Sequence, residues 1–177
     1  MDKQSTDLRD TQLTGRILDI GGGGEGVISR HAGGSVIAID RLKEELEESP
    51  DIGIKIIMDA TDMKFLDNTF DNATCFYSLM FMNKPTAEKC LSEAYRVLKP
   101  GGCLWIWDTV IPNITTEEIF IVQLGVTLAK EEISIGYGIR WTRGQSEDDL
   151  SEICTRIGFR QLKCESSDEK IFMKLQK

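Results

Sequence analysis

Short runs of apolar residues alternate in this chain with segments in which apolar residues recur every three or four positions. The short runs are typical of strands that are covered on both faces, and the other segments are typical of helices with one buried face. We interpret residues 16–20, 35–39, 54–58, 73–78 and 103–107 as strands one to five. Strands that alternate with helices in this way predict a mainly parallel sheet.

Two helices have clear start and stop signals. The first begins near Pro85, between strands four and five, and the sequence Pro100-Gly101-Gly102 ends it. The second begins at Ser146, which has the capping-box spacing to Asp149, and ends at Gly158. Shorter helices are expected at residues 27–31 and 43–48.

The second half of the chain predicts two hairpins. Residues 160–165 and 170–175 flank a polar turn, so we expect the sheet to end antiparallel. Residues 120–128 alternate between apolar and mostly polar or smaller positions, and the alternation returns over residues 133–141. A period of two indicates strands, which predicts an antiparallel hairpin at about residues 119–141, inserted after strand five. The expected fold class is therefore α/β, with a Rossmann-like, mainly parallel sheet, an antiparallel C-terminal strand and an inserted β-hairpin.

Length and composition are those of one globular domain spanning residues 1–177, since 41% of the residues are hydrophobic and 28% are charged. No stretch approaches the roughly 20 consecutive apolar residues that span a bilayer, and the polar residues 1–12 lack the apolar region of a signal peptide. We therefore expect a cytoplasmic protein that does not associate with membranes.

Charge argues against a nucleic-acid-binding protein, and the cysteine pattern argues against a disulfide framework or a metal site. The formal net charge of -8 would repel a phosphate backbone, so nucleic acid is not an expected partner. The five cysteines are scattered and form no CxxC pair, which favours reduced thiols over a disulfide framework or a metal site.

The segment richest in chemistry is a glycine loop with the sequence Asp19-Ile20-Gly21-Gly22-Gly23-Gly24-Glu25-Gly26, which leaves strand one and enters a short helix. Glycine permits positive φ and close approach of a ligand to the backbone, and free N–H groups at the helix start favour polar or anionic groups. Asp40 ends strand two, where a carboxylate can accept hydrogen bonds from ribose hydroxyls. Together they predict a nucleoside site.

The glycine spacing leaves the type of nucleoside open, because Gly21, Gly23 and Gly26 also fit the GxGxxG pattern of nicotinamide and flavin dinucleotides. Asp19 favours another ligand. A carboxylate at this position would repel a pyrophosphate and attract a cationic amino group. S-adenosylmethionine carries such a group.

From about Gly15 to the C-terminus the chain resembles the class I S-adenosylmethionine-dependent methyltransferases, especially those that act on small molecules. The start of the glycine loop resembles the family's first motif, and Asp40 resembles its ribose-binding acid. Asp59-Ala60 and Phe70-Asp71 resemble its adenine-contact loop and fourth strand. The most specific mark is Arg96-Val97-Leu98-Lys99-Pro100-Gly101-Gly102, because dinucleotide dehydrogenases do not typically carry this turn.

This resemblance implies S-adenosylmethionine as the cofactor, S-adenosylhomocysteine as the product and a small-molecule acceptor. Asp19, Ile20 and the backbone of Gly21, Gly22 and Gly23 would hold the methionine part of the cofactor, and Asp40 the ribose. Arg41, Asp59 and Ala60 would contact the adenine, and Tyr77 and Ser78 would border the sulfonium. Whether Gly24 or Gly26 serves as the third motif glycine stays open. Almost nothing precedes strand one, where many relatives carry helices that cover the site.

Methyl transfer is an in-line displacement, so positioning and desolvation suffice without an acid, a base or a metal. If a base takes part, Tyr77 and Asp108 are the candidates, and both are better placed than His31. The inserted hairpin is expected either to govern the acceptor or a contact with a second copy in a homodimer, or to cover the core, since Tyr137 and Trp141 share its apolar face.

Two other functions fit parts of the pattern. A nicotinamide-dependent oxidoreductase fits the GxGxxG match, although Asp19 and the Lys99-Pro100-Gly101-Gly102 turn oppose it. A non-catalytic S-adenosylmethionine-binding protein shares every cofactor motif and is separable only by activity.

Overall fold

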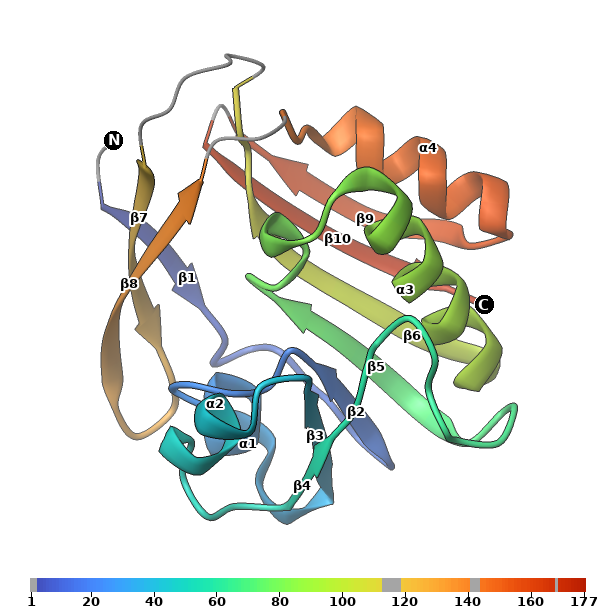
Figure 1. The fold of residues 1–177 in the computed structure, drawn as a ribbon, viewed down its shortest axis with the longest axis horizontal. Coiled ribbons are helices and arrows are strands. Elements are labelled where there is room, and N and C mark those ends of the chain that lie inside the picture. The colour runs from blue at the N-terminus through green and yellow to red at the C-terminus, as the bar shows by residue number, and fades with distance from the viewer. Residues whose placement is uncertain (1–2, 113–118, 141–143, 168) are drawn as a thin grey trace.

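The computed structural model describes residues 3–112, 119–140, 144–167 and 169–177. Its larger sheet has seven strands in the order β4-β3-β2-β5-β6-β10-β9, and its smaller sheet has three in the order β1-β7-β8. The larger sheet comprises β2 (Ile17–Ile20), β3 (Val36–Asp40), β4 (Ile54–Ile57), β5 (Phe70–Phe76), β6 (Leu98–Thr109), β9 (Arg160–Ser166) and β10 (Lys170–Gln176). The smaller comprises β1 (Gln4–Asp7), β7 (Ile119–Thr127) and β8 (Glu132–Arg140). Figure 1 shows β5 and β6 running toward the smaller sheet.

The predicted parallel sheet with an antiparallel end is confirmed. β2 lies between β3 and β5 and pairs with both in parallel, and β5 pairs in parallel with β6. β10 is antiparallel to β6, and β9 is antiparallel to β10. The carboxyl ends of the parallel strands therefore meet at one edge of the sheet, which is where ligands bind in open α/β folds.

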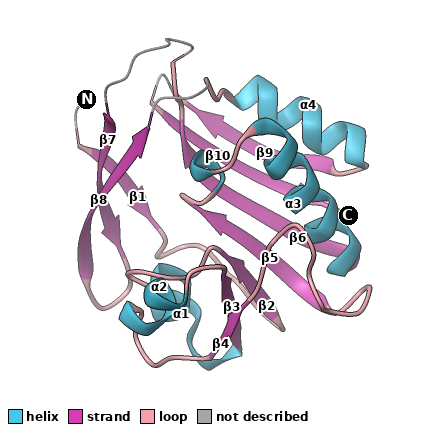
Figure 2. Ribbon diagram, in the orientation of Figure 1, coloured by secondary structure: helices cyan, strands magenta, loops and turns pink. Residues whose placement is uncertain are grey.

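The two long helices begin where the sequence predicts. α3 (Lys84–Val97) follows Asn83, whose side chain accepts a hydrogen bond from the Thr86 N–H. α4 (Glu147–Ile157) has a complete capping box between Ser146 and Asp149. Both helices cross the same face of the larger sheet, as Figure 2 shows, and bury their apolar stripes against it. The short helices are α1 (Val27–Ala32) and α2 (Lys43–Glu48), with two 3₁₀ turns, η1 (Gly33–Ser35) and η2 (Leu79–Phe81).

The turn after α3 differs from the prediction. Pro100-Gly101-Gly102 lies inside β6, which begins at Leu98, rather than between the helix and the strand. The residue before a proline favours extended backbone, so the chain leaves the helix early. Gly101 has a φ of 80°, and the pairing of β6 with β5 shifts register here.

A loop without helix or strand joins β4 to β5, and Arg96 on α3 holds it in place. The guanidinium of Arg96 donates to the carbonyls of Met63 and Phe65, at 2.8 Å each. It also pairs with Glu93 and with Asp67. Arg96, the first residue of the Arg96–Gly102 motif, therefore holds in place the loop that carries the predicted adenine contacts.

The smaller sheet covers the second face of the larger one. β7 and β8 form the predicted antiparallel hairpin, and their apolar positions pack with Phe76, Trp105 and Trp107. The sequence analysis assigned no element before residue 16, but β1 pairs in parallel with β7. Its inward residues, Gln4 and Thr6, are polar, so no apolar pattern marked the strand. Trp141 lies outside the described residues.

No helix in the described ranges is long and apolar enough to cross a membrane.

Candidate active site

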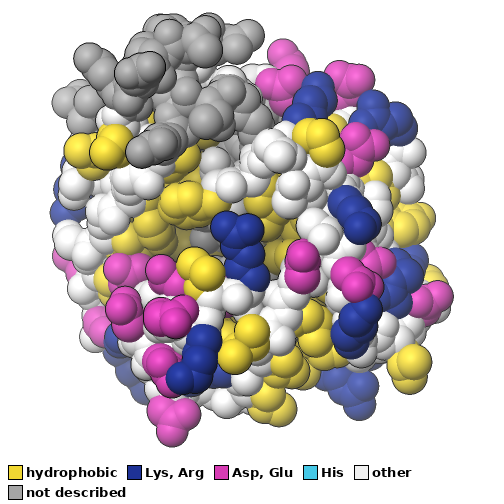
Figure 3. All heavy atoms as spheres, viewed as in Figure 1, with side chains coloured by type: hydrophobic (Ala, Val, Ile, Leu, Met, Phe, Trp, Pro, Cys, Tyr) yellow, Lys and Arg dark blue, Asp and Glu magenta, His cyan; other side chains and the backbone are white. Residues whose placement is uncertain are grey.

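A cavity of about 420 Å³ opens where the carboxyl ends of β2, β3 and β5 meet. The glycine loop, α2, the η2 turn, the start of α3 and Tyr137 of β8 form its walls. Figure 3 shows a hollow near the centre of this face, bordered by hydrophobic side chains, with acidic side chains gathered below it over α2. The cavity lies at the edge of the sheet predicted for ligand binding.

The glycine loop is held by backbone hydrogen bonds to neighbouring elements. The N–H groups of Gly21 and Gly22 both donate to the Ile39 carbonyl, at 2.9 and 3.1 Å, and the Gly24 N–H donates to the Glu45 carbonyl at 2.8 Å. The loop is therefore bound to β3 on one side and to α2 on the other.

Both candidates for the third glycine have the positive φ that glycine adopts without strain, 59° at Gly24 and 56° at Gly26. Gly24 lines the cavity, whereas Gly26 precedes α1 and packs against Pro50. Gly24 thus lies at the cavity, and Gly26 is the glycine that precedes the helix.

Several glycines admit close contacts that a side chain would block. A β-carbon on Gly21 would stand 2.6 Å from the Ser78 β-carbon, and one on Gly22 would stand 2.6 Å from a carboxylate oxygen of Asp19. A β-carbon on Gly23 would stand 2.5 Å from the Glu45 β-carbon. The loop can pack this closely because these three positions carry no side chain. We call the backbone of Gly21–Gly23 the glycine cradle.

Asp19 lies beneath this cradle. It is only 2% exposed and accepts a hydrogen bond from the Thr74 hydroxyl at 2.7 Å. Burial raises its pKa to about 7, and Asp40 raises it further in the same direction. Neither Asp19 nor its neighbours Ile20 and Gly22 contribute to the cavity lining, so they support the loop from below.

Of the residues predicted at the ribose and adenine, the structure brings Asp40, Arg41 and Ala60 to the cavity. One oxygen of Asp40 accepts from the Leu42 N–H at 2.9 Å. Asp59 is exposed and does not line the cavity, because its carboxylate accepts from both the N–H and the hydroxyl of Thr61. These bonds lower the pKa of Asp59.

Ser78 and Tyr77 end β5 but point to different surroundings. Ser78 lines the cavity, is 7% exposed, and its hydroxyl has no hydrogen-bond partner in the described structure. Tyr77 has a φ of 50°, which is strained for a bulky residue. Its hydroxyl donates to the Gln4 side chain of β1 at 3.0 Å, and burial raises its pKa.

Asp108 is fully buried at the end of β6. One of its oxygens accepts from the N–H groups of Leu79 and Met80, at 3.0 and 3.2 Å, so it supports the η2 turn. The other accepts from the Thr109 N–H and the Gln145 amide. Burial raises the pKa of Asp108 to about 6.

His31, which sequence analysis had placed last among the candidate bases, lies apart from the cavity lining. A nitrogen of its partly buried ring is 2.8 Å from the Thr11 carbonyl, so it secures the segment that precedes β2.

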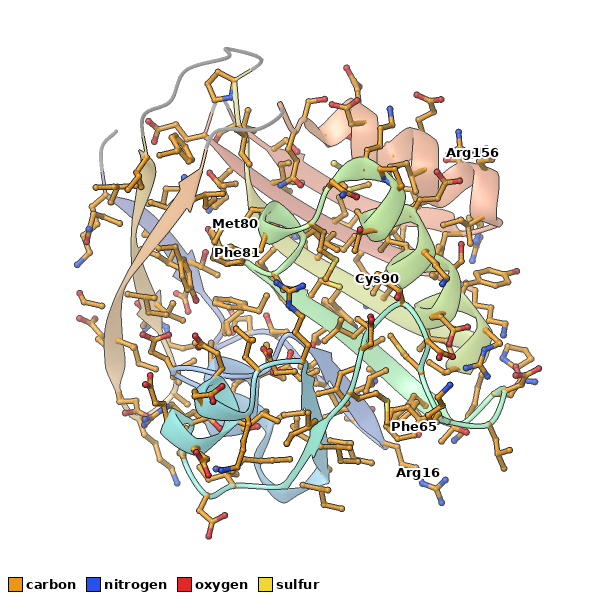
Figure 4. All side chains as sticks on the ribbon, viewed as in Figure 1. Arg16, Phe65, Met80, Phe81, Cys90 and Arg156 are labelled. Atoms are coloured by element: carbon orange, nitrogen blue, oxygen red, sulfur yellow. The ribbon has the colours of Figure 1, made fainter. Side chains whose placement is uncertain are left out.

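Sequence reasoning missed the aromatic wall of the cavity. Figure 4 shows Met80 and Phe81 together on η2. The Phe81 ring meets Tyr137 of β8 edge to face, with centroids 6.0 Å apart. Tyr137 stacks on Tyr77 at 5.9 Å. The alternation of β8 placed Tyr137 on the buried face, but nothing in the sequence places that face beside η2.

The cavity lining carries more negative than positive charge. Glu25, Asp40 and Glu45 line it, and Arg41 is the single cationic side chain in the lining that the structure describes. Burial raises the pKa of Glu45, and the neighbouring Asp40 raises it further. Such a site attracts a ligand that carries positive charge.

Comparisons with known proteins agree with this geometry. A family model described as a methyltransferase domain matches residues 18–106, about half of the chain. A demethylmenaquinone methyltransferase of Renibacterium salmoninarum is 41% identical over 105 residues, which cover 55% of this chain and 43% of that protein. The chain spans about half the length of the curated relatives it matches.

Solved structures share the fold at low identity. An S-adenosylmethionine-dependent methyltransferase from Mesorhizobium loti is 14% identical with a TM-score of 0.64, covering 92% of this chain and 90% of that one. The cyclase SpnF is 17% identical with a TM-score of 0.68, covering 92% of this chain and 74% of that one. The glycine cradle, the neighbouring strand ends and the match to the family model lead to one assignment: the chain belongs to the methyltransferase domain family.

Proposed function

We propose that the protein transfers a methyl group from S-adenosylmethionine to a small-molecule acceptor and releases S-adenosylhomocysteine. The observation that carries this proposal is the buried Ser78 hydroxyl, which has no hydrogen-bond partner among the described residues and belongs to a side chain that lines the cavity beside the bare backbone of Gly21. A buried polar atom without a partner is costly, so the site is suited to a ligand with polar groups at this point. The residues present therefore fit the cofactor.

Each side of the cavity suits one part of that cofactor. The Gly21–Gly23 backbone and the carboxylate of Asp19 below it would hold the methionine part, and Asp40 would accept from the ribose hydroxyls. Arg41 and Ala60 would border the adenine. An adenine contact by Asp59 stays a prediction, since its carboxylate is bonded to Thr61.

The bound cofactor would supply an electrophilic methyl group on a cationic sulfonium. The protein's own part is then to orient the acceptor and to exclude water. We assign positioning roles to the two candidate bases. The Tyr77 hydroxyl already donates to Gln4, and a raised pKa makes a phenol a poor base near neutral pH. Both oxygens of Asp108 accept from neighbouring donors.

A ligand-induced shift in melting temperature tests the proposal. A ligand that binds only the folded state raises the melting temperature, so S-adenosylmethionine and S-adenosylhomocysteine at millimolar concentration should do so, while NAD and NADP should not. Stabilisation by NAD alone would support an oxidoreductase and remove the methyltransferase assignment.

The finer expectations about partners and location belong to the same proposal. We place the protein in the cytoplasm, where its five free cysteines would stay reduced. A homodimer stays a prediction that the mass in solution would test.

A further inference from the structure

The wall of the cavity formed by η2 and β8 is chemically unlike the wall formed by the glycine loop. Acidic side chains line the loop side, whereas Phe81, Met82 and Tyr137 form an uncharged wall opposite. Phe81 is 54% exposed, so this wall reaches the mouth of the cavity. If the cofactor occupies the glycine side, as proposed above, the uncharged wall is left for the acceptor.

Of the three residues on this wall, Tyr137 has a side-chain hydroxyl group that can form hydrogen bonds. One face of its ring is covered by Tyr77, at an interplanar angle of 20°. Its hydroxyl has no hydrogen-bond partner among the described residues, although Tyr137 lines the cavity. Burial raises the pKa of Tyr137, so the side chain stays a neutral phenol that can donate or accept.

The charges around Tyr137 restrict the acceptor further. Besides burial, the groups that raise the pKa of Tyr137 are Glu25, Tyr77, Asp108 and Asp19, three of which are carboxyl groups, and Glu25 lines the cavity. An anionic acceptor would be repelled by them. A cationic acceptor would be repelled by the sulfonium, and a protonated amine has no lone pair with which to attack a methyl group.

We infer that Tyr137 selects the acceptor, and that the acceptor is an uncharged, planar, conjugated molecule with a hydroxyl or carbonyl group that bonds to the Tyr137 hydroxyl. A planar molecule packs against aromatic rings in offset-stacked or edge-to-face geometry, which suits Tyr137 and Phe81. This inference rests on the proposed function. It goes beyond the family assignment, because the family model ends at residue 106 and Tyr137 lies outside the matched range.

Calorimetric titration of the full chain tests the inference in two steps. The first titration measures S-adenosylhomocysteine binding. In the second, the protein is saturated with sinefungin, a cofactor analogue whose ammonium group replaces the methylated sulfonium, and is titrated near neutral pH with four probes of similar size. These are 2-naphthol, the anion 2-naphthoate, the cation 2-naphthylmethylammonium and the saturated, non-planar decahydro-2-naphthol.

We expect 2-naphthol to bind at least about fivefold more tightly than each of the other three. Tyr137→Phe removes one neutral hydrogen bond and should weaken 2-naphthol binding about 3- to 10-fold. Tyr95→Phe is the matched control. Tyr95 lies on α3, packs against Phe159 and does not line the cavity, so this substitution should leave 2-naphthol binding unchanged.

The inference is overturned if 2-naphthol shows no measurable binding, if the three planar probes bind equally, if the saturated alcohol binds best, or if Tyr137→Phe and Tyr95→Phe have equal effects. In each of these cases S-adenosylhomocysteine binding in the first titration would leave the proposed function standing. Failure of that first titration would remove the proposed function, and the inference with it.

Discussion

Ser78 lies so close to Gly21 that a β-carbon on the glycine would stand 2.6 Å from the β-carbon of the serine. Gly21 also has a φ of 75°, which costs a residue with a side chain about 1–3 kcal/mol. Gly21→Ala should therefore displace Ser78 or the loop and weaken S-adenosylhomocysteine binding at least about tenfold, measured by calorimetry.

Gly34→Ala is the matched control for this substitution. A β-carbon at Gly34 meets nothing within 4 Å, and Gly34 is not among the glycines with positive φ. Equal affinities in the two folded variants would show that the contact between Gly21 and Ser78 is not part of the cofactor site.

Asp40 is proposed to accept charge-assisted hydrogen bonds from the ribose, each worth about 1.5–3 kcal/mol. Asp40→Ala should weaken S-adenosylhomocysteine binding about 10- to 100-fold. The control is Asp51→Ala, because Asp51 is exposed and does not line the cavity. An Asp40→Ala protein that folds and binds as tightly as the Asp51→Ala control would exclude Asp40 from the site.

The main sheet and the glycine loop could be predicted because their signals are local. Apolar runs mark β2 and β5, and the capping box of Ser146 and Asp149 marks the start of α4. β1 could not be predicted in this way. Its buried residues Gln4 and Thr6 are polar and are accommodated by tertiary contacts, such as the bonds from Gln4 to Thr109 and to the Glu169 carbonyl.

The cavity walls were predictable only in part, because some of their residues reach the cavity through tertiary contacts. Gly21 directly follows β2 and Asp40 ends β3, so their positions follow from two successive predicted strands. Tyr137 reaches the cavity only because β7 and β8 fold over the second face of the sheet. Asp108 was expected near the chemistry because it ends β6, yet four donors surround its oxygens, and their positions depend on the folded chain.

Asp108 should make stability depend on pH in an identifiable direction. Burial raises its pKa from 3.8 to about 6, so between these values the folded state holds more protons than the unfolded state. Stability is then highest below the unfolded value and falls as the pH rises through the folded value. Relative to Asp108→Asn, the wild type should lose about 2–3 kcal/mol of unfolding free energy between about pH 4 and about pH 7.

Chemical denaturation at several pH values measures this difference, and Asp71→Asn supplies a control of opposite sign. The Lys99 ammonium and the Arg16 N–H lower the pKa of Asp71, so the stability that Asp71 contributes is lost as the pH falls. A wild type whose stability relative to Asp108→Asn stays constant, or rises with pH, would contradict the role assigned to the buried carboxyl.

The transfer of a labelled methyl group tests the central claim most directly. The protein is incubated with S-adenosylmethionine carrying a deuterated methyl group and with a protein-free extract of cellular small molecules, and the products are analysed by mass spectrometry. We predict that S-adenosylhomocysteine accumulates in proportion to the protein added, that the labelled methyl group appears on a small molecule, and that Gly21→Ala lowers both when S-adenosylmethionine is limiting. If S-adenosylmethionine binds but the label stays on it in every extract fraction, the chain is a cofactor-binding protein without transferase activity, and the proposed function is wrong.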